Sequence, residues 1–580
     1  MPFNPFKSHD RSDFPGVVVP ITSFPAHRPH SPAHAHTGSD SEKKSTDDAR
    51  SEAAASLPEC GQMLSVKALR AEVESDIATS GHDSAYDRKA KVINRAIQDI
   101  GMGRYQWELF VLCGFGWLAD NLWLQGVALT LPQLELEFGV SESRVRFTTC
   151  ALFLGLCLGA SFWGTASDII GRRLAFNMTL FICGTFGLAA GGSPTWIGVC
   201  ALFSCMGLGV GGNLPVDGAL FLEFLPFASG NLLTMLSVWW PVGQLIASLL
   251  AWAYIPNYTC ASNLPSCHKV AAGVACCSKQ DNMGWRYLVL TLGALTFTMF
   301  LCRFVLFHLY ESPKFLLSRG RQDEAVAAVH GIAYKNKATT WLTVNILNEI
   351  GGYPEETPNQ TLSTMQIVRR SVSKFSFERV GPLFATKRLG FTTILLWFCW
   401  ATIGMGYPLF NAFLPQYLSK SGNGGTTSTY IVYRNYAITS VVGLPGSILA
   451  CFLVDMRYLG RKGTMAIATL ITGIILFCFT ASTNSNTQLV CSSLEAFFQN
   501  IMYGVLYAYT PEVFPAPNRG TGTGIASCLN RITGLCAPLV AIYGANANPN
   551  APIYASGGLI LAAFVAMCLL PIETRGKQTL

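Results

Sequence analysis

The sequence predicts an all-α membrane protein with twelve transmembrane helices in two six-helix bundles. Three observations lead to this fold class. Half of the 580 residues are hydrophobic and only 13% are charged, whereas a soluble domain carries about 25% charged residues. Twelve apolar runs have the length of roughly 20 residues that a helix needs to cross a bilayer. A short polar motif also occurs once in each half of the chain, which indicates two homologous halves.

The repeated motif lies between two apolar runs in both places. Its first copy reads Gly-Thr-Ala-Ser-Asp-Ile-Ile-Gly-Arg-Arg over residues 164–173, and a looser copy reads Val-Asp-Met-Arg-Tyr-Leu-Gly-Arg-Lys over 454–462. One carboxylate, one glycine and two cations suit a tight loop between two membrane helices. Because Lys and Arg are enriched in cytoplasmic loops, both copies are expected on the cytoplasmic side.

The first hundred residues are polar and contain no apolar run long enough for a signal peptide. We interpret residues 1–100 as a disordered cytoplasmic tail. Within it, the range 85–98 is a candidate for a basic amphipathic helix on the membrane surface. A histidine tract is compatible with metal binding, but an unstructured tail is the simpler interpretation, and no metal site is predicted. The tract consists of His27, His30, His34 and His36.

The twelve apolar runs form two groups of six, separated by a cytoplasmic linker loop at 309–388. The expected spans are 107–131, 145–166, 174–194, 197–222, 231–254, 286–308, 389–415, 430–454, 464–483, 488–510, 521–545 and 552–571. They define an N-terminal bundle (101–308), a C-terminal bundle (389–571) and a short C-terminus (572–580). The loops rich in Lys and Arg all fall on one side, so both termini are expected in the cytoplasm.

The segment 255–285 falls on the opposite side of the membrane. Four cysteines in one outward-facing loop indicate one or two disulfides in an oxidising space, with the pairing left open. The sequon at Asn257 makes this residue a candidate for glycosylation. Use of the sequon would imply a secretory route, and the plasma membrane is the expected location. The four cysteines are Cys260, Cys267, Cys276 and Cys277.

Several motifs resemble the sugar-porter branch of the major facilitator superfamily. Glu311–Lys314 resembles the motif after helix 6, and Pro571–Gly576 resembles the motif after helix 12. Tyr509–Pro515 resembles the end of helix 10, and Gly207–Gly212 resembles part of helix 4. The resemblance covers residues 105–580. It implies a carrier that works by alternating access and uses a proton gradient in place of a bound cofactor.

The pocket-forming helices depart from sugar porters. The seventh span, around Leu396–Gly404, lacks the paired glutamines of sugar porters, and Phe203 stands where they place an arginine in helix 4. Gly114–Asn121 in the first span and Asn530–Gly534 in the eleventh resemble the branch of synaptic-vesicle-2-related proteins and organic-ion transporters. The resemblance is to a fungal member of this branch. This branch implies an organic ion more than a hexose.

Asp120 lies near the middle of the first span, where a charged group costs several kcal/mol and is a functional candidate. A carboxylate in a low-dielectric cavity can bind and release a proton, as a proton-coupled carrier requires. Trp117 is its neighbour on the same helix. The structural alternative is a hydrogen bond from Asp120 to another helix.

Arg531 lies near the middle of the eleventh span. Its charge is permanent, so it must pair with an acid or face an aqueous cavity. The guanidinium fork suits a carboxylate, a sulfate or a phosphate. The alternative is a permanent salt bridge, for which Glu495 in the tenth span is a possible partner.

Other polar and aromatic groups interrupt the apolar spans. Asn213 and Asp217 lie one helical turn apart and share a face. Gln499, Tyr503 and Tyr507 also share a face. Such groups can line a small-molecule cavity, although ordinary helix packing explains each of them equally well. The further members of this set are Trp240, Gln244 and Asn411.

A third set of charged residues lies at the cytoplasmic helix ends. By resemblance to the family, they form ion pairs between helices that open and close the cytoplasmic face and do not select the substrate. Arg172 with Glu223 and Arg461 with Glu512 are the expected pairs. The full gating set is Asp168, Arg172, Arg173, Glu223, Asp455, Arg461, Glu512 and Arg519.

These observations predict a proton symporter for a small organic solute, with an organic anion favoured. The net charge of +7 arises from cations in loops, so the expected partners are a solute and the lipid bilayer, not nucleic acid. The carrier is expected to be a monomer and not an enzyme. Three alternatives stay open: a sugar or polyol carrier, an exporter of drugs or secondary metabolites by proton antiport, and a sensor that transports nothing.

Overall fold

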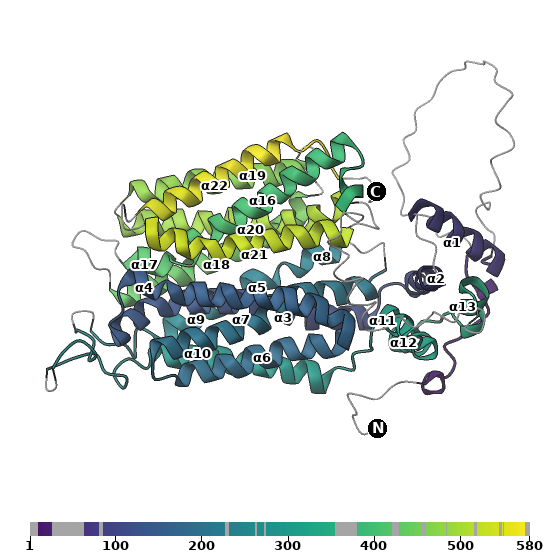
Figure 1. The fold of residues 1–580 in the computed structure, drawn as a ribbon, viewed down its shortest axis with the longest axis horizontal. Coiled ribbons are helices and arrows are strands. Elements are labelled where there is room, and N and C mark those ends of the chain that lie inside the picture. Colours follow the sequence, from purple (N-terminus) through teal and green to yellow (C-terminus); the bar gives the residue numbers. More distant parts are fainter. Residues whose placement is uncertain are drawn as a thin grey trace, which may run out of the picture.

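The computed structural model describes residues 10–25, 63–80, 85–226, 231–261, 264–271, 274–353, 380–419, 428–454, 456, 459–482, 484–514, 519–544, 548 and 550–574. Its named elements are all helices. They form two parallel bundles and a smaller group of helices at one end of them (Figure 1). The histidine tract and Asp455 lie outside the described residues.

The two bundles repeat one packing pattern. In the first bundle α5 and α6 pack on α7, α10 packs on α6, and α3 packs on α9; in the second, α18 and α19 pack on α20, α22 packs on α19, and α16 packs on α21. The first bundle comprises α3 (Arg104–Phe138), α4 (Glu142–Val145), α5 (Phe147–Ile170), α6 (Arg172–Gly192), α7 (Trp196–Phe224), α8 (Asn231–Leu236), α9 (Trp239–Tyr254) and α10 (Gly284–Leu301). The second comprises α16 (Lys387–Asn411), α17 (Leu414–Ser419), α18 (Thr429–Leu453), α19 (Gly460–Ala481), α20 (Ser485–Val513), α21 (Arg519–Gly544) and α22 (Ala551–Leu569).

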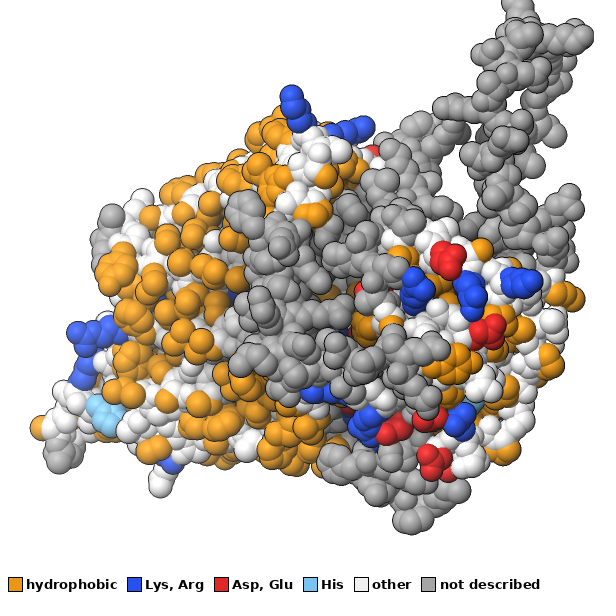
Figure 2. Space-filling model, turned by 45° about the vertical axis from the view of Figure 1, so that its right-hand side comes forward, with side chains coloured by type: hydrophobic (Ala, Val, Ile, Leu, Met, Phe, Trp, Pro, Cys, Tyr) orange, Lys and Arg blue, Asp and Glu red, His pale blue; other side chains and the backbone are white. Residues whose placement is uncertain are grey.

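Ten helices of the described chain are long and apolar enough to cross a membrane. The two other expected spans fall on α3 and on α8 with α9. The helix α9 has only 16 residues, and α3 carries Asp120, Asn121 and Gln125 in its middle, which lower its hydropathy. Figure 2 shows apolar side chains over the visible face of the bundles, as a lipid-facing surface requires.

A group of short helices, here called the linker module, lies at one end of the bundles (Figure 1). It contains α1 (Val66–Ser80), α2 (Ala85–Ile100), α11 (Pro313–Ser318), α12 (Gln322–Lys335) and α13 (Val344–Gly351). The prediction of a disordered tail over 1–100 is therefore wrong for residues 10–25 and for α1 and α2. The apolar face of α2 packs on α11, α12 and α13. The prediction that this face lies on a membrane surface is therefore wrong.

Substituting Ile93 by aspartate should release α2 from the linker module. Ile93 is fully buried in the module's apolar core, and burying an unpaired charge destabilises a fold by about 4 kcal/mol or more. We expect trypsin to cleave the variant within 85–100 at least tenfold faster than the parent protein, as judged by gel analysis. Lys67→Asp changes charge at an exposed position of α1 and serves as the control; equal cleavage in both variants would contradict the packing of α2.

The opposite end of the bundles, here called the disulfide end, carries the segment between α9 and α10. Two disulfides close this segment, Cys260–Cys277 and Cys267–Cys276, which confirms the expectation of one or two bridges and supplies the pairing. Ser266 Oγ donates a hydrogen bond of 2.6 Å to the carbonyl oxygen of Glu137 at the end of α3. The segment is therefore attached to the first bundle.

Candidate functional site

An ion pair joins the two bundles near their middle. Arg531 Nη2 on α21 lies 3.3 Å from Asp120 Oδ1 on α3. The second carboxylate oxygen, Asp120 Oδ2, accepts a hydrogen bond of 2.9 Å from the indole Nε1 of Trp240 on α9. Asp120 is 1% exposed and Arg531 is 7% exposed. The ion-pair partner of Arg531 is therefore Asp120 of the other bundle and not Glu495.

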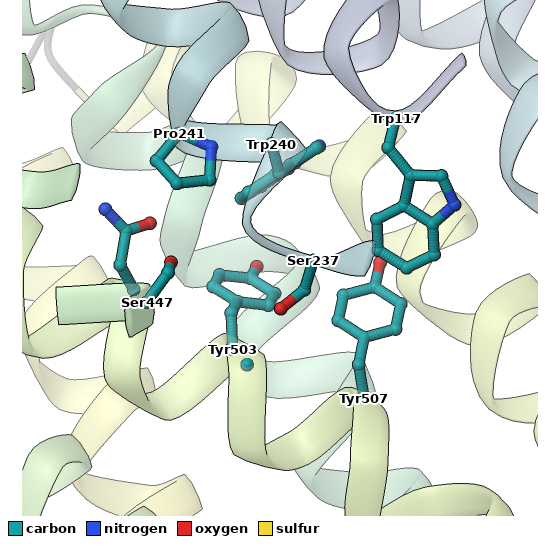
Figure 3. A pocket seen from close by; sticks show the side chains of 9 residues that line it. Trp117, Ser237, Trp240, Pro241, Ser447, Tyr503 and Tyr507 are labelled. Atoms are coloured by element: carbon teal, nitrogen blue, oxygen red, sulfur yellow. The ribbon is translucent and has the colours of Figure 1, made fainter. Parts of the chain in front are cut away.

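A small cavity lies beside this pair, between the two bundles (Figure 3). About 230 Å³ of its space is not filled by protein atoms, and this figure includes a part that is open to the surroundings. Aromatic rings form much of its wall. Trp240 lies 5.3 Å from Tyr503 between ring centroids, and Trp117 lies 5.3 Å from Tyr507. The indole Nε1 of Trp117 is buried and has no hydrogen-bond partner among the described residues. The lining residues are Trp117, Ser237, Trp240, Pro241, Ser447, Asn500, Tyr503, Gly504 and Tyr507.

Polar contacts close the space between the bundles on the disulfide side of the cavity. Gln125 Nε2 on α3 donates a hydrogen bond of 2.7 Å to the hydroxyl of Tyr407 on α16, and the hydroxyl of Tyr436 on α18 donates to Gln125 Oε1. Closer to that end, Tyr433 donates a bond of 2.7 Å to the carbonyl oxygen of Leu129. These bonds hold α3 against both α16 and α18.

Arg146 adds a further bond network at the disulfide end. Its Nη1 donates to the carbonyl oxygen of Ala541 at 2.7 Å, and its Nε donates to Gln416 Oε1 at 3.2 Å. Both acceptors belong to the second bundle, whereas Arg146 immediately precedes α5. The guanidinium also lies over the ring of Phe413 and pairs with Glu142 of its own bundle at 3.1 Å. Arg146 thus ties the two bundles together.

At the linker end, each copy of the repeated motif forms an ion pair within its own bundle. Arg172 Nε lies 3.1 Å from Glu223 Oε1 in the first bundle, and Arg461 pairs with Glu512 in the second. A second carboxylate accepts from the first backbone N–H groups of the following helix in both places, as is common at helix N-termini. Glu311 accepts from the backbone N–H groups of Arg172 and Arg173. Burial raises the pKa of the Glu311 carboxyl above its usual value, although these hydrogen bonds oppose the effect. Glu573 accepts from Arg461 and Lys462.

The remaining gating candidates are only partly described. The backbones of Asp168 and Arg519 lie in α5 and α21, and their side chains are outside the described part of the structure, as is the whole of Asp455. The structure thus places the two expected pairs, Arg172–Glu223 and Arg461–Glu512, at the linker end.

Three further predicted site residues, all in the first bundle, lie away from the cavity wall. Asp217 Oδ2 pairs with Arg303 Nη2 at 2.7 Å, and both side chains are fully buried inside the first bundle. Asn213 is also fully buried, and neither of its side-chain polar atoms has a partner in the described structure. Gln244 is buried on α9 and does not line the cavity.

A second polar cluster lies inside the second bundle. Asn411 Nδ2 donates to Gln499 Oε1 at 3.0 Å and to Glu495 Oε1 at 3.3 Å. Asn411 and Gln499 were predicted from their positions on apolar helices, but they form this cluster and do not line the cavity. Tyr503 and Trp240 do line it, as predicted.

Sequence reasoning missed Arg303, Arg146, Gln125, Tyr407 and Tyr436. Arg303 stands inside the expected sixth span, so a charge in an apolar run was an available signal. Gln125 follows Asn121 by one helical turn on the same face as Trp117. Tyr407 and Tyr436 carry no signal that separates them from other tyrosines near helix ends.

Two similar helical bundles with a charged pair and a cavity between them define a membrane transporter. The chain belongs to the Major Facilitator Superfamily, whose family model matches residues 110–456 and 435–580. This family consists of transporters and not of enzymes, and the predicted resemblance is confirmed.

Curated relatives and solved structures agree with this assignment. "MFS siderochrome iron transporter 1" of Ceriporiopsis subvermispora is 45% identical over 86% of this chain and 93% of its own length. "Major facilitator-type transporter hxnZ" of Emericella nidulans is 40% identical over 88% and 91%, and "Synaptic vesicle 2-related protein" of Rattus norvegicus is 26% identical over 84% and 82%. The proton:xylose symporter XylE has a similar fold, with a TM-score of 0.57 and 18% identity over 82% of this chain and 98% of that one.

Proposed function

We propose that this carrier imports a small organic anion together with a proton. Arg531 binds the anion, and Asp120 binds the proton. The observation that supports this proposal is the Asp120–Arg531 pair, which links the bundles beside a cavity. In the empty carrier the Asp120 carboxylate occupies the anion site on Arg531. Protonation of Asp120 removes its charge and frees the guanidinium for the carboxylate of a substrate.

The cavity supplies the other substrate contacts in this proposal. Aromatic walls with a few polar groups are typical of small-molecule sites. The ring of Trp117 forms part of this wall. Trp240 donates a hydrogen bond to Asp120 and lines the cavity. Protonation of Asp120 therefore changes the hydrogen bonding of a residue in the cavity wall.

Transport follows by alternating access, with the two bundles rocking about the central site. The bonds of Gln125, Tyr433 and Arg146 stabilise a state that is closed at the disulfide end, which we assign to the outside of the cell. The Arg172–Glu223 and Arg461–Glu512 pairs, each formed within one bundle in the present conformation, gate the cytoplasmic face by rearranging as the linker end opens and closes.

Substitution of Asp120 by asparagine tests the proton coupling. Purified protein is placed in liposomes with an internal pH dye, no proton gradient is imposed, and pools of organic acids, sugars and amines are added in turn. For the parent protein we expect acidification inside with the organic acid pool. The asparagine variant cannot take up this proton, so the acidification should fall. Acidification as large in Asp120→Asn as in the parent protein would remove Asp120 from the proposed role.

The same assay separates the other candidate functions. A signal with the sugar pool alone would identify a sugar or polyol carrier, and proton release on substrate export would identify an antiporter. The 45% identical relative is named for siderochrome iron, so an iron(III) chelate is tested as a further substrate. Binding without any transport, detected as thermal stabilisation by a solute, would indicate a sensor.

Glycosylation of Asn257 tests the orientation and the secretory route. Asn257 is exposed after α9, next to the disulfide-bonded segment. We expect the protein from a eukaryotic plasma membrane to migrate faster on a gel after treatment with a glycosidase that removes Asn-linked glycans. Asn257→Gln should migrate at the faster position without treatment. No shift on treatment of the parent protein would contradict the use of this sequon.

A further inference from the structure

Glu495 is a buried acid in the second bundle that no part of the proposed mechanism uses. It is fully buried on α20. Its Oε1 accepts a long hydrogen bond of 3.3 Å from Asn411 Nδ2, and its Oε2 has no hydrogen-bond partner among the described residues. The other buried membrane acids described above, Asp120 and Asp217, each face an arginine. Glu495 has no cation within salt-bridge distance in the described structure.

The titratable groups that face Glu495 in the described structure are three tyrosines, whose hydroxyls are uncharged at neutral pH. They are Tyr407 on α16, Tyr436 on α18 and Tyr503 on α20 itself. Arg434 on α18 hydrogen-bonds to Asn435 Oδ1 beside it on the same helix.

The remaining helices that pack on α20 bring no charge to Glu495. Arg461 and Lys462 lie at the opposite, linker end of α19, and Cys478 is exposed on the lipid side of that helix. Asp120 and Arg531 pair with each other, and α8 has no titratable residue. Because an isolated carboxylate without a cation is strongly disfavoured in a medium of low polarity, a carboxyl in these surroundings takes up a proton.

The position of Glu495 connects it to the transport pathway. Glu495, Gln499, Tyr503 and Tyr507 follow one another at four-residue spacing and share a face of α20. Tyr503 and Tyr507 line the cavity, and Glu495 lies about 12 Å from Tyr503 along the helix axis, toward the disulfide end. Its hydrogen-bond donor, Asn411, follows Tyr407 by one turn of α16, and Tyr407 bonds to Gln125 across the bundles.

We propose that Glu495 is a second proton-binding site of the carrier, filled when the bundles separate at the disulfide end and sealed with its proton in the present conformation. The proposal rests on the proposed function, since it adds a second proton to the one assigned to Asp120. Import of a monovalent anion would then carry one net positive charge inward.

Infrared difference spectroscopy on the full-length protein tests the site, with the proton itself as the probe. A protonated carboxyl has a carbonyl stretching band that the carboxylate lacks. At pH 7 we expect such a band in the parent protein and its loss in Glu495→Gln. The band should persist in Glu108→Gln, in which the altered acid is paired with Arg104 and Lys335, and in Asp120→Asn.

A second variant keeps the test independent of the folding of Glu495→Gln. Asn411→Leu removes the hydrogen-bond donor of Glu495 and leaves the acid in place, so the same band should move to higher frequency. An unchanged band in both variants, or no band in the parent protein, would overturn the proposal. If the band behaves as expected but no solute pool moves protons in liposomes, the proposed function fails while the proton site on Glu495 stands.

Discussion

Replacing Arg531 by glutamine is expected to raise the half-saturating concentration of an organic acid substrate by about 10- to 100-fold. The substitution removes the charge and the fork of donors that bind a carboxylate. Hydrogen bonds to charged groups contribute about 1.5–3 kcal/mol, and each 1.4 kcal/mol changes affinity by about tenfold. The measurement is the concentration dependence of uptake of a radiolabelled organic acid into liposomes. Arg531→Lys keeps the charge without the fork of donors, so its half-saturating concentration should lie between those of the parent protein and Arg531→Gln.

A double variant separates anion binding from a structural salt bridge. Arg531→Gln alone leaves Asp120 as a buried acid without its cation, and this alone could impair the carrier. Asp120→Asn combined with Arg531→Gln removes both charges. If Arg531 served only to neutralise Asp120, the double variant would recover substrate affinity. We expect affinity to stay low, because no cation is left for the anion. Arg104→Gln removes an exposed charge at the start of α3 and should leave uptake unchanged.

The two halves and most charged site residues could be predicted from sequence, because a charge in an apolar run and a repeated motif are local signals. Which charged residues pair with each other could not be predicted. Asp120 and Arg531 lie 411 residues apart, and their pairing depends on how α3 and α21 rotate about their axes. The same limit applies to Asp217, which was a candidate because it shares a face with Asn213 on an apolar helix and which the fold pairs with Arg303.

The tail was misinterpreted for a related reason. The sequence 85–100 is amphipathic, and an amphipathic helix without a known partner suits a membrane surface equally well. Its partner helices begin more than 200 residues later, at Pro313. The contact between them is tertiary information that periodicity does not contain. Trp341 Nε1 in the linker, which donates to Asp99 Oδ2 at the end of α2 over 2.8 Å, is part of the same contact.

Arg303→Met is expected to destabilise the first bundle by about 3–5 kcal/mol, the usual cost of leaving one member of a buried ion pair without its partner. Arg303 lies in the π-helical turn Cys302–Leu306 that follows α10. Its guanidinium contacts three other helices: Asp217 on α7, the carbonyl oxygen of Leu112 on α3 at 2.9 Å, and that of Phe176 on α6 at 2.8 Å. The measurement is the midpoint of thermal unfolding in detergent, followed by size-exclusion chromatography.

Removing both charges should restore most of this stability. A buried ion pair can often be replaced by apolar residues of similar size at little cost, so Arg303→Met with Asp217→Leu should unfold at a higher temperature than Arg303→Met alone. Transport by the double variant then decides the role of Asp217. A stable double variant that transports like the parent protein would show that the pair is structural, as its position away from the cavity wall implies. A stable double variant without transport would contradict this and return Asp217 to the substrate or proton pathway.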